Sequence, residues 1–229
     1  MKRILTAFII GLSLTIGTAS SAMVKNFHKG FEAYQKGDYQ TALREWRSFA
    51  EQGDADAQYN LGLIYDNGKG VTEDNKAAVK WYRLAAEQGY VKAQYNLGLM
   101  YDNGEGVTED NKAAVKWYRL AADQGYVKAQ YNLGVIYDNG EGVTEGDKAA
   151  VKWYRVAAEQ GYAEAQNILG VMYDNGEGVT KDNKAAMKWY RLSAEQSYAK
   201  AQFNLGLMYD NGEGVTEDNK AAVKWYRLA

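Results

Sequence analysis

The chain has 229 residues, with 27 Lys and Arg, 29 Asp and Glu, one His and no Cys, and its formal net charge at pH 7 is −2. The lack of Cys excludes disulfides, thiol nucleophiles and thiolate metal sites. The slightly acidic balance gives no electrostatic reason to bind nucleic acid or an anionic membrane.

The N-terminus predicts a secretory signal peptide. A basic start, MKR, precedes an apolar run from Ile4 to Ile16 and the small residues GTASSA. This arrangement predicts cleavage after Ala22, and an uncleaved anchor helix is the alternative. No other segment is apolar enough to cross a membrane, and no Cys follows the leader to carry a lipid. We therefore expect an exported protein, periplasmic or secreted, that is not a lipoprotein.

Residues 23–53 predict a divergent helical hairpin. Trp46 lies 35 residues before Trp81, whereas the later tryptophans are 36 apart, so one residue has been lost. Only KGD separates the two helices of this segment. It predicts the N-terminal capping unit that a repeat array needs.

Residues 54–229 repeat with a fixed period of 36. Alanine, glycine and tryptophan each recur at this step, as in Ala57, Ala93, Ala129, Ala165 and Ala201. A period of about 20–50 residues is the mark of a repeat architecture. The predicted units are 57–92, 93–128, 129–164, 165–200 and a shortened 201–229.

Each unit predicts two helices joined by a loop. In the first helix, Ala57, Leu61, Ile64 and Tyr65 form one helical stripe. In the second, the predicted stripe is Ala77, Ala78, Trp81, Leu84 and Ala85. Neither helix can bury its stripe alone, so the pairs must stack into an all-α solenoid. Gly89, Gly125 and Gly161 are predicted left-handed caps, and Ser197 replaces the fourth.

The loop DNGEGVTED raises the question of a phosphate or cation site. It lacks the Lys and hydroxyl of a P-loop, and it fails the third, fifth and sixth positions of an EF-hand. A turn explains it better: Gly104 and Gly106 supply positive φ, Val107 packs below, and Asp110 caps the second helix. In the third unit Gly146 takes the cap position, and Asp147 could shift the helix start. The alternative is a weak cation ridge along the stacked acidic loops.

The repeated residues resemble those of the Sel-one-like repeat, a relative of the tetratricopeptide repeat. That resemblance implies a right-handed superhelical solenoid of antiparallel helix pairs, and a scaffold that binds other proteins, often in bacterial envelopes. The first unit is similar to a plain tetratricopeptide hairpin. A cysteine-rich branch of the family is linked to β-lactams, but this chain has no Cys. The matching positions in the second unit are Ala93, Leu97, Gly98, Tyr101, Gly104, Gly106, Val107, Asp110, Ala113, Trp117, Tyr118, Ala121, Ala122 and Gly125.

No catalytic, metal or cofactor site is predicted. The single histidine, His28, has no Cys to pair with and would supply only one imidazole to a zinc site. It is interpreted as a surface residue of the capping unit. Acidic residues are frequent, but no pair stands out as a glycosidase pair. The sequence therefore predicts a protein that is not an enzyme.

A partner-binding surface is predicted on the first helices. By the resemblance, these helices line the concave face of the solenoid. On a helical wheel, two positions per unit lie opposite the buried stripe. The alternative is that these side chains only pack against the first helix of the neighbouring unit. The predicted residues are Tyr59, Leu63, Tyr95, Leu99, Tyr131, Val135, Asn167, Val171, Phe203 and Leu207.

The functional hypothesis is an exported, non-enzymatic scaffold that binds a protein or peptide through that concave face, in the bacterial envelope. The alternative is an envelope accessory protein or hydrolase acting on peptidoglycan, polysaccharide or a β-lactam. The sequence stops at Ala229 inside a predicted second helix. Two explanations stay open: a fragment of a longer protein, or an apolar end covered by a partner or by self-association with a second copy.

Overall fold

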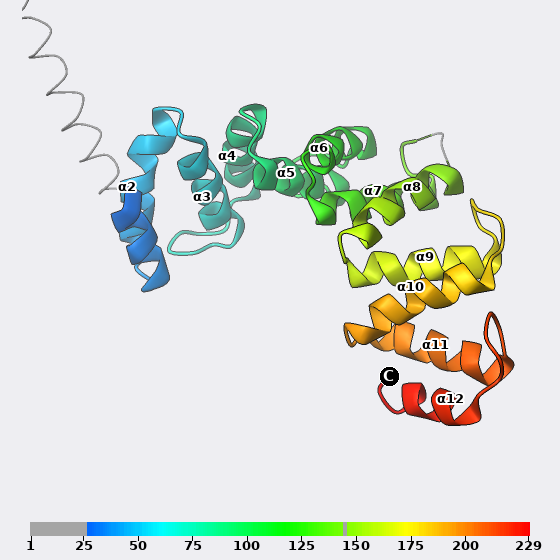
Figure 1. The fold of residues 1–229 in the computed structure, drawn as a ribbon. Coiled ribbons are helices and arrows are strands. Elements are labelled where there is room, and N and C mark those ends of the chain that lie inside the picture. The colour runs from blue at the N-terminus through cyan, green and yellow to red at the C-terminus, as the bar shows by residue number, and fades with distance from the viewer. Residues whose placement is uncertain (1–26, 144–145) are drawn as a thin grey trace, which may run out of the picture. The chain divides into compact units, whose positions relative to one another are not determined.

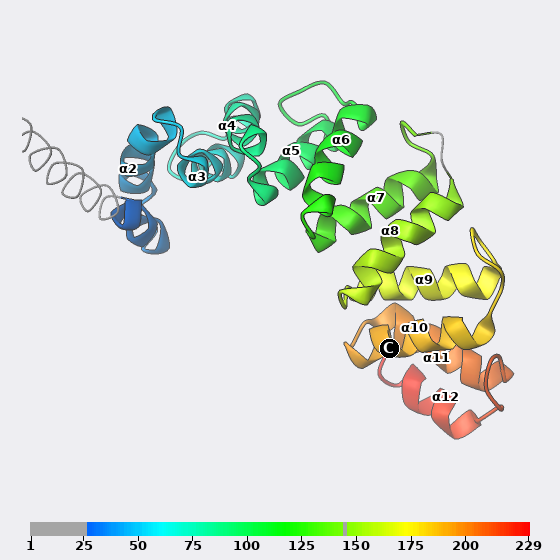
Figure 2. The same ribbon diagram turned by 45° about the horizontal axis from the view of Figure 1, so that its top comes forward.

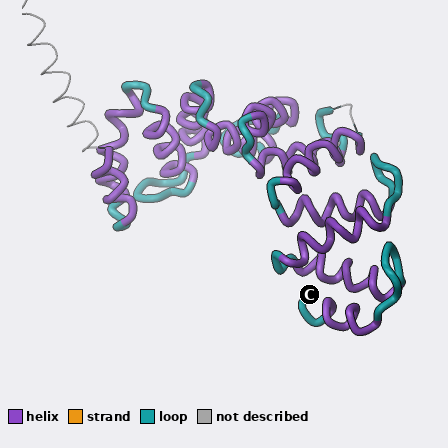
Figure 3. Tube along the Cα trace, viewed as in Figure 1, coloured by secondary structure: helices purple, strands orange, loops and turns teal. Residues whose placement is uncertain are grey.

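The computed structural model describes residues 27–143 and 146–229, so the predicted signal peptide at residues 1–22 lies outside the described part. Within this part all regular structure is helical, which confirms the all-α prediction (Figure 3). The helices are residues 27–35, α2 (Tyr39–Glu51), α3 (Ala55–Asp66), α4 (Asn75–Glu87), α5 (Val91–Asn103), α6 (Asn111–Asp123), α7 (Val127–Asn139), α8 (Asp147–Glu159), α9 (Ala163–Asn175), α10 (Asn183–Glu195), α11 (Ala199–Asn211) and α12 (Asn219–Tyr226).

Helices pack in successive pairs, and the chain forms an all-α repeat solenoid. The most extensive packing joins α3 with α4, α7 with α8, α9 with α10 and α11 with α12 (Figures 1 and 2). The chain divides into two compact units. The first contains residues up to Met100 and Gly104–Thr108, and the second contains Tyr101–Asn103 and Glu109–Ala229.

Local signals set the ends of the helices as predicted. The Asp110 side chain accepts a hydrogen bond from the backbone N–H of Ala113, so it caps the start of α6. Gly140 ends α7 in the left-handed region with φ 71°, and Gly142 turns the chain with φ 67°. The valine of this loop packs on a hydrophobic cluster in the first and last repeats, where it is Val71 and Val215. The loop is therefore a turn built by its glycines and its capping aspartate.

Two departures from the repeat have structural consequences. Helix α8 begins at Asp147 with Gly146 as its N-cap and no capping side chain, so the suggested shift of the helix start is wrong. Ser197 adopts φ 63°, the conformation that its glycine equivalents adopt elsewhere. For a residue with a side chain this conformation costs roughly 1–2 kcal/mol. Both sites are weaker than their counterparts in the other repeats.

The buried face of the second helix agrees with the prediction only in part. Ala78 and Ala85 of the predicted stripe have no exposed surface. Tyr82, which the prediction left out, is also fully buried, whereas Leu84 is 37% exposed and Trp81 is half-buried. In the first-helix stripe, Ala57, Leu61 and Ile64 are fully buried as predicted, and Tyr65 is half-buried.

A glycine on the facing helix explains why the tyrosine of the second helix is buried. In the third repeat, a Cβ added to Gly134 of α7 would lie 2.5 Å from the ring carbons of Tyr154 on α8. The ring therefore packs directly on the α7 backbone. The same arrangement joins Gly62 with Tyr82, Gly170 with Tyr190 and Gly206 with Tyr226. The absence of a side chain at this position of the first helix leaves room for the tyrosine ring in the core.

Buried glutamines join each repeat to the one before. The side-chain amide of Gln130 donates to the backbone carbonyl of Ala122, and Gln160 donates 2.6 Å to the Gln130 Oε1. The bond to Ala122 satisfies a carbonyl near the C-terminal end of α6. Equivalent amide-to-carbonyl bonds come from Gln58, Gln94, Gln166 and Gln202.

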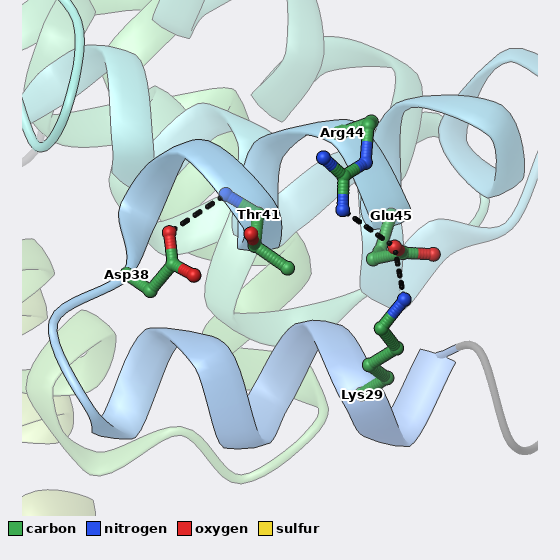
Figure 4. Close-up of polar contacts among 5 residues, drawn as sticks. All are labelled: Lys29, Asp38, Thr41, Arg44 and Glu45. Carbon is green, nitrogen blue, oxygen red and sulfur yellow. Dashed lines mark hydrogen bonds and ion pairs between the residues drawn. The ribbon is translucent and has the colours of Figure 1, made fainter.

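The N-terminal hairpin pairs residues 27–35 with α2 (Figure 4). Lys29 and Glu45 form an ion pair of 2.8 Å across the two helices, and Asp38 caps α2 through the Thr41 N–H. The hydrogen bond from Lys29 is the main cause that lowers the pKa of Glu45. Trp46, only 1% exposed, fills the centre of this hairpin.

Candidate partner-binding face

The predicted aromatic column lies against other tyrosines. The Tyr59 ring centroid is 5.8 Å from that of Tyr82 and 5.0 Å from that of Tyr90. Tyr131 repeats this arrangement with Tyr154 and Tyr162 at 5.9 and 5.1 Å. Each ring thus packs partly within its own repeat and partly on the residue that precedes the next first helix, and it is half-buried.

The other predicted positions differ in exposure. Phe203 and Leu207 are 51% and 37% exposed, and Asn167 is 7% exposed. The Asn167 Oδ1 accepts a hydrogen bond of 3.1 Å from the amide of Asn204, so this residue takes part in packing within the chain. The remaining positions are half-buried: Tyr59, Leu63, Tyr95, Leu99, Tyr131, Val135 and Val171.

A groove of about 370 Å³ opens on this face in the first unit. Its walls come from the hairpin, α3 and α5. Two predicted residues, Tyr59 and Leu63, lie in it. The complete lining is Phe27, Phe31, Tyr34, Trp46, Asp56, Tyr59, Asn60, Leu63, Tyr90 and Lys92.

Most of the groove's aromatic wall was not predicted. Phe27, Phe31 and Tyr34 occur at i, i+4 and i+7, so they share one face of the helix at residues 27–35. This spacing was visible in the sequence FHKGFEAY. The stripe lies in the divergent hairpin, outside the regular repeats on which the prediction of the first-helix face rests. Phe31 is 48% exposed, which makes it the most accessible large apolar side chain in the lining.

The groove also carries polar groups of both charges. Asp56 is hydrogen-bonded to the Tyr90 hydroxyl; burial is the main cause that raises the pKa of Tyr90, and this carboxylate adds to it. Lys92 and Asn60 contribute an ammonium and an amide to the same lining. Aromatic walls with a few polar groups are the composition of sites that hold apolar side chains and orient a polar backbone.

A hydrogen bond between a tyrosine and an aspartate joins the two helices within a repeat. The hydroxyls of Tyr82 and Tyr118 donate to Asp66 and Asp102 at 2.9 and 3.1 Å. Burial is the main cause that raises the pKa of both carboxyl groups. These aspartates bind tyrosines of the chain itself, so their geometry is structural.

Within residues 27–143 and 146–229, no group of three or more His, Asp or Glu side chains is placed to hold a metal ion. His28 is exposed, as interpreted from the sequence. None of the helices in that same part is both long and apolar enough to span a bilayer.

Comparison with known families gives one match. Five consecutive segments fit the family model described as Sel1 repeat: residues 55–90, 91–126, 127–162, 163–198 and 199–229. Each segment begins two residues before the corresponding repeat predicted from the sequence, so the two divisions differ only in where a repeat is taken to begin. No curated protein sequence matches the chain significantly.

Solved structures share the fold. A Sel1 repeat protein from Oxalobacter formigenes is 38% identical, with a TM-score of 0.80 over 89% of this chain and 81% of that one. The protective antigen c5321 of uropathogenic Escherichia coli, which displays an SLR fold, is 39% identical, with a TM-score of 0.87. It matches 94% of this chain, which spans only 47% of that protein. The immunity protein PA5088 of Pseudomonas aeruginosa, 20% identical with a TM-score of 0.53 over 87% and 80% of the two chains, resembles it in fold alone.

Proposed function

This chain belongs to the Sel1 repeat family, and from that premise we propose that it is an exported, non-catalytic scaffold that holds a protein or peptide partner on its first-helix face. Sel1 repeat proteins are generally scaffolds for protein–protein interaction. The fold is generally non-catalytic. Self-association through the C-terminal end and the envelope location both stay predictions.

One observation carries the proposal. The groove of about 370 Å³ is the place where the predicted face, through Tyr59 and Leu63, meets the aromatic stripe of the hairpin. Residues enriched at the centres of protein interfaces are large aromatic ones that fill or line pockets. The groove offers such rings together with Asp56, Asn60 and Lys92, which can fix the orientation of a bound backbone.

Export is supported by the basic start, the apolar run and the small residues before Met23. Expression of the full chain in a bacterium, followed by mass spectrometry of the extracytoplasmic fraction, tests it. A chain beginning at Met23 supports export. A chain retained in the cytoplasm with residues 1–22 attached contradicts it.

Peptide binding by the groove is tested with a random peptide library displayed on phage and the purified chain as bait. Phe31→Ala is expected to weaken binding of the selected peptides at least about fivefold, because truncation of an exposed aromatic anchor costs more than about 1 kcal/mol. Titration by fluorescence anisotropy measures the affinity.

Val156→Ala is the matched control. Val156 is 40% exposed but lies on α8, in the second compact unit, whereas the groove residues lie in the first. Its truncation is expected to leave the peptide affinity unchanged. Equal affinities for the parent and Phe31→Ala, or a loss caused by Val156→Ala alone, would remove the groove as the binding site.

A further inference from the structure

In the second compact unit, the second helix of each of three repeats carries exposed lysines, which together form a row. They occupy the second and sixth positions of α6, α8 and α10, and no acidic residue lies between them. None forms an ion pair within 4 Å with another residue of the described chain. We call this set the lysine row; its members are Lys112, Lys116, Lys148, Lys152, Lys184 and Lys188.

A row of glutamates runs beside the lysine row. Glu141, Glu177 and Glu213 each precede the second glycine of a loop. That glycine lies against the first turn of the preceding second helix, because a Cβ on Gly178 would be 2.5 Å from the Asp147 carbonyl oxygen and one on Gly214 2.6 Å from that of Asn183. In Figure 1 the α9–α10 and α11–α12 loops lie on the same edge of the stack. We call these three residues the glutamate row.

The glutamate row also has no ion pair within the described chain. Glu141 and Glu177 accept hydrogen bonds from the neighbouring amides of Asn139 and Asn175. Two rows of opposite charge therefore run side by side with the same 36-residue period, and neither neutralises the other.

Grooves without a carboxylate lie along the lysine row. One, of about 250 Å³, is lined by Arg119, Tyr137, Ala149, Lys152, Trp153 and Val156. The other, of about 240 Å³, is lined by Lys184, Met187, Lys188, Arg191, Leu192 and Gly214. Both combine an apolar floor with at least two cations, and Val156 and Leu192 are 40% and 37% exposed. A carboxylate on a short apolar stem fits such a groove.

We propose that a second copy of this chain docks on this face, with the glutamate row of each copy placed along the lysine row of the other. A two-fold axis parallel to the rows brings unlike charges together on both sides and keeps repeat opposite repeat. Such an interface is self-complementary and closes at two copies.

Charge and spacing favour a second copy over a polyanion. A dense polyanion laid on the lysine row would run beside the glutamate row, on a chain whose formal net charge is −2. A second copy presents both signs in adjacent rows at the same period. Exposed ion pairs are individually weak and are screened by salt, so the dimer is expected to be reversible and sensitive to ionic strength.

Analytical ultracentrifugation of the full chain, at about 0.02 M and about 0.5 M salt, tests the proposal. The parent is expected to dimerise at low salt and to dissociate at high salt. The charge reversals Lys152→Glu with Lys188→Glu, and separately Glu141→Lys with Glu177→Lys, are each expected to give monomers. An equimolar mixture of the two reversed chains is expected to restore a dimer, because their rows again have unlike charges.

The matched control reverses Lys128 and Lys200, which are exposed on the first helices α7 and α11 and lie outside the lysine row. This variant is expected to dimerise like the parent. Circular dichroism of each variant verifies folding. A parent that stays monomeric at low salt overturns the proposal. So does a mixture that fails to dimerise, or binding of a polyanion such as polygalacturonate to the lysine row in place of a second copy.

Discussion

Replacing Tyr154 by alanine is expected to lower the free energy of unfolding by about 4 kcal/mol, the largest effect of any single truncation considered for this chain. The ring is 1% exposed and packs on the α7 backbone at Gly134. It also contacts the Tyr131 ring, and its hydroxyl donates to Asp138. The change leaves a cavity between two helices and an unpaired carboxyl group. Urea unfolding followed by circular dichroism measures the loss.

Trp153→Ala is the control for the face of the helix. Trp153 adjoins Tyr154 in the sequence and has the larger side chain, but it is only half-buried on α8. Its truncation is expected to cost clearly less than that of Tyr154. The reverse order would show that the tryptophan faces the core, as the sequence pattern predicted, and would contradict the packing described above.

Gly134→Ala is expected to destabilise the chain by about 1–3 kcal/mol, the usual range for overpacking. Helix propensity alone predicts the opposite sign, because alanine in a helix is better than glycine by roughly 1 kcal/mol. The added Cβ would lie 2.5 Å from two carbons of the Tyr154 ring, which is held on its other side by the core. The same urea titration measures the change.

Two further variants test whether a clash between the added Cβ and the Tyr154 ring causes the loss of stability. Gly161→Ala places a Cβ in open space at φ 89° and is expected to cost only the backbone strain, roughly 1–2 kcal/mol. Combining Gly134→Ala with Tyr154→Leu is expected to cost less than the sum of the two single changes, because the smaller side chain relieves the clash. A stabilising Gly134→Ala would show that the tyrosine ring does not pack on α7.

The helices and their ends could be predicted from the sequence because their signals are local. Asp110 caps α6 through a backbone N–H three residues away, and Gly104 ends α5 through its own φ of 71°. Neither needs a residue from another helix. The fixed 36-residue period made the stacking predictable as well, since a helix pair cannot bury its apolar stripes alone.

The choice between Trp153 and Tyr154 could not be predicted in this way. Both are large, adjacent and repeated, so the period offers no distinction. What decides between them is the missing side chain at Gly134, on a different helix. Packing between elements is not encoded in the periodicity of either element.

The candidate site was predicted only in part. Tyr59 and Leu63 line the groove, but the hairpin supplies Phe27, Phe31 and Tyr34. The prediction of the first-helix face followed the regular repeats, and the groove lies where the regular repeats meet the divergent unit. Its position depends on packing between residues 27–35 and α3, which the sequence pattern does not contain.

The most direct test of the scaffold proposal is site-specific photocrosslinking. A photoreactive phenylalanine analogue is placed at Phe31 in the groove, and in a second chain at Val156 on the second helix α8. Each chain is irradiated with the peptide selected from the library, and the crosslinked product is quantified by mass spectrometry. We predict strong crosslinking from position 31 and none above background from position 156. Crosslinking from position 156 alone, or equal yields from both positions, would contradict the account.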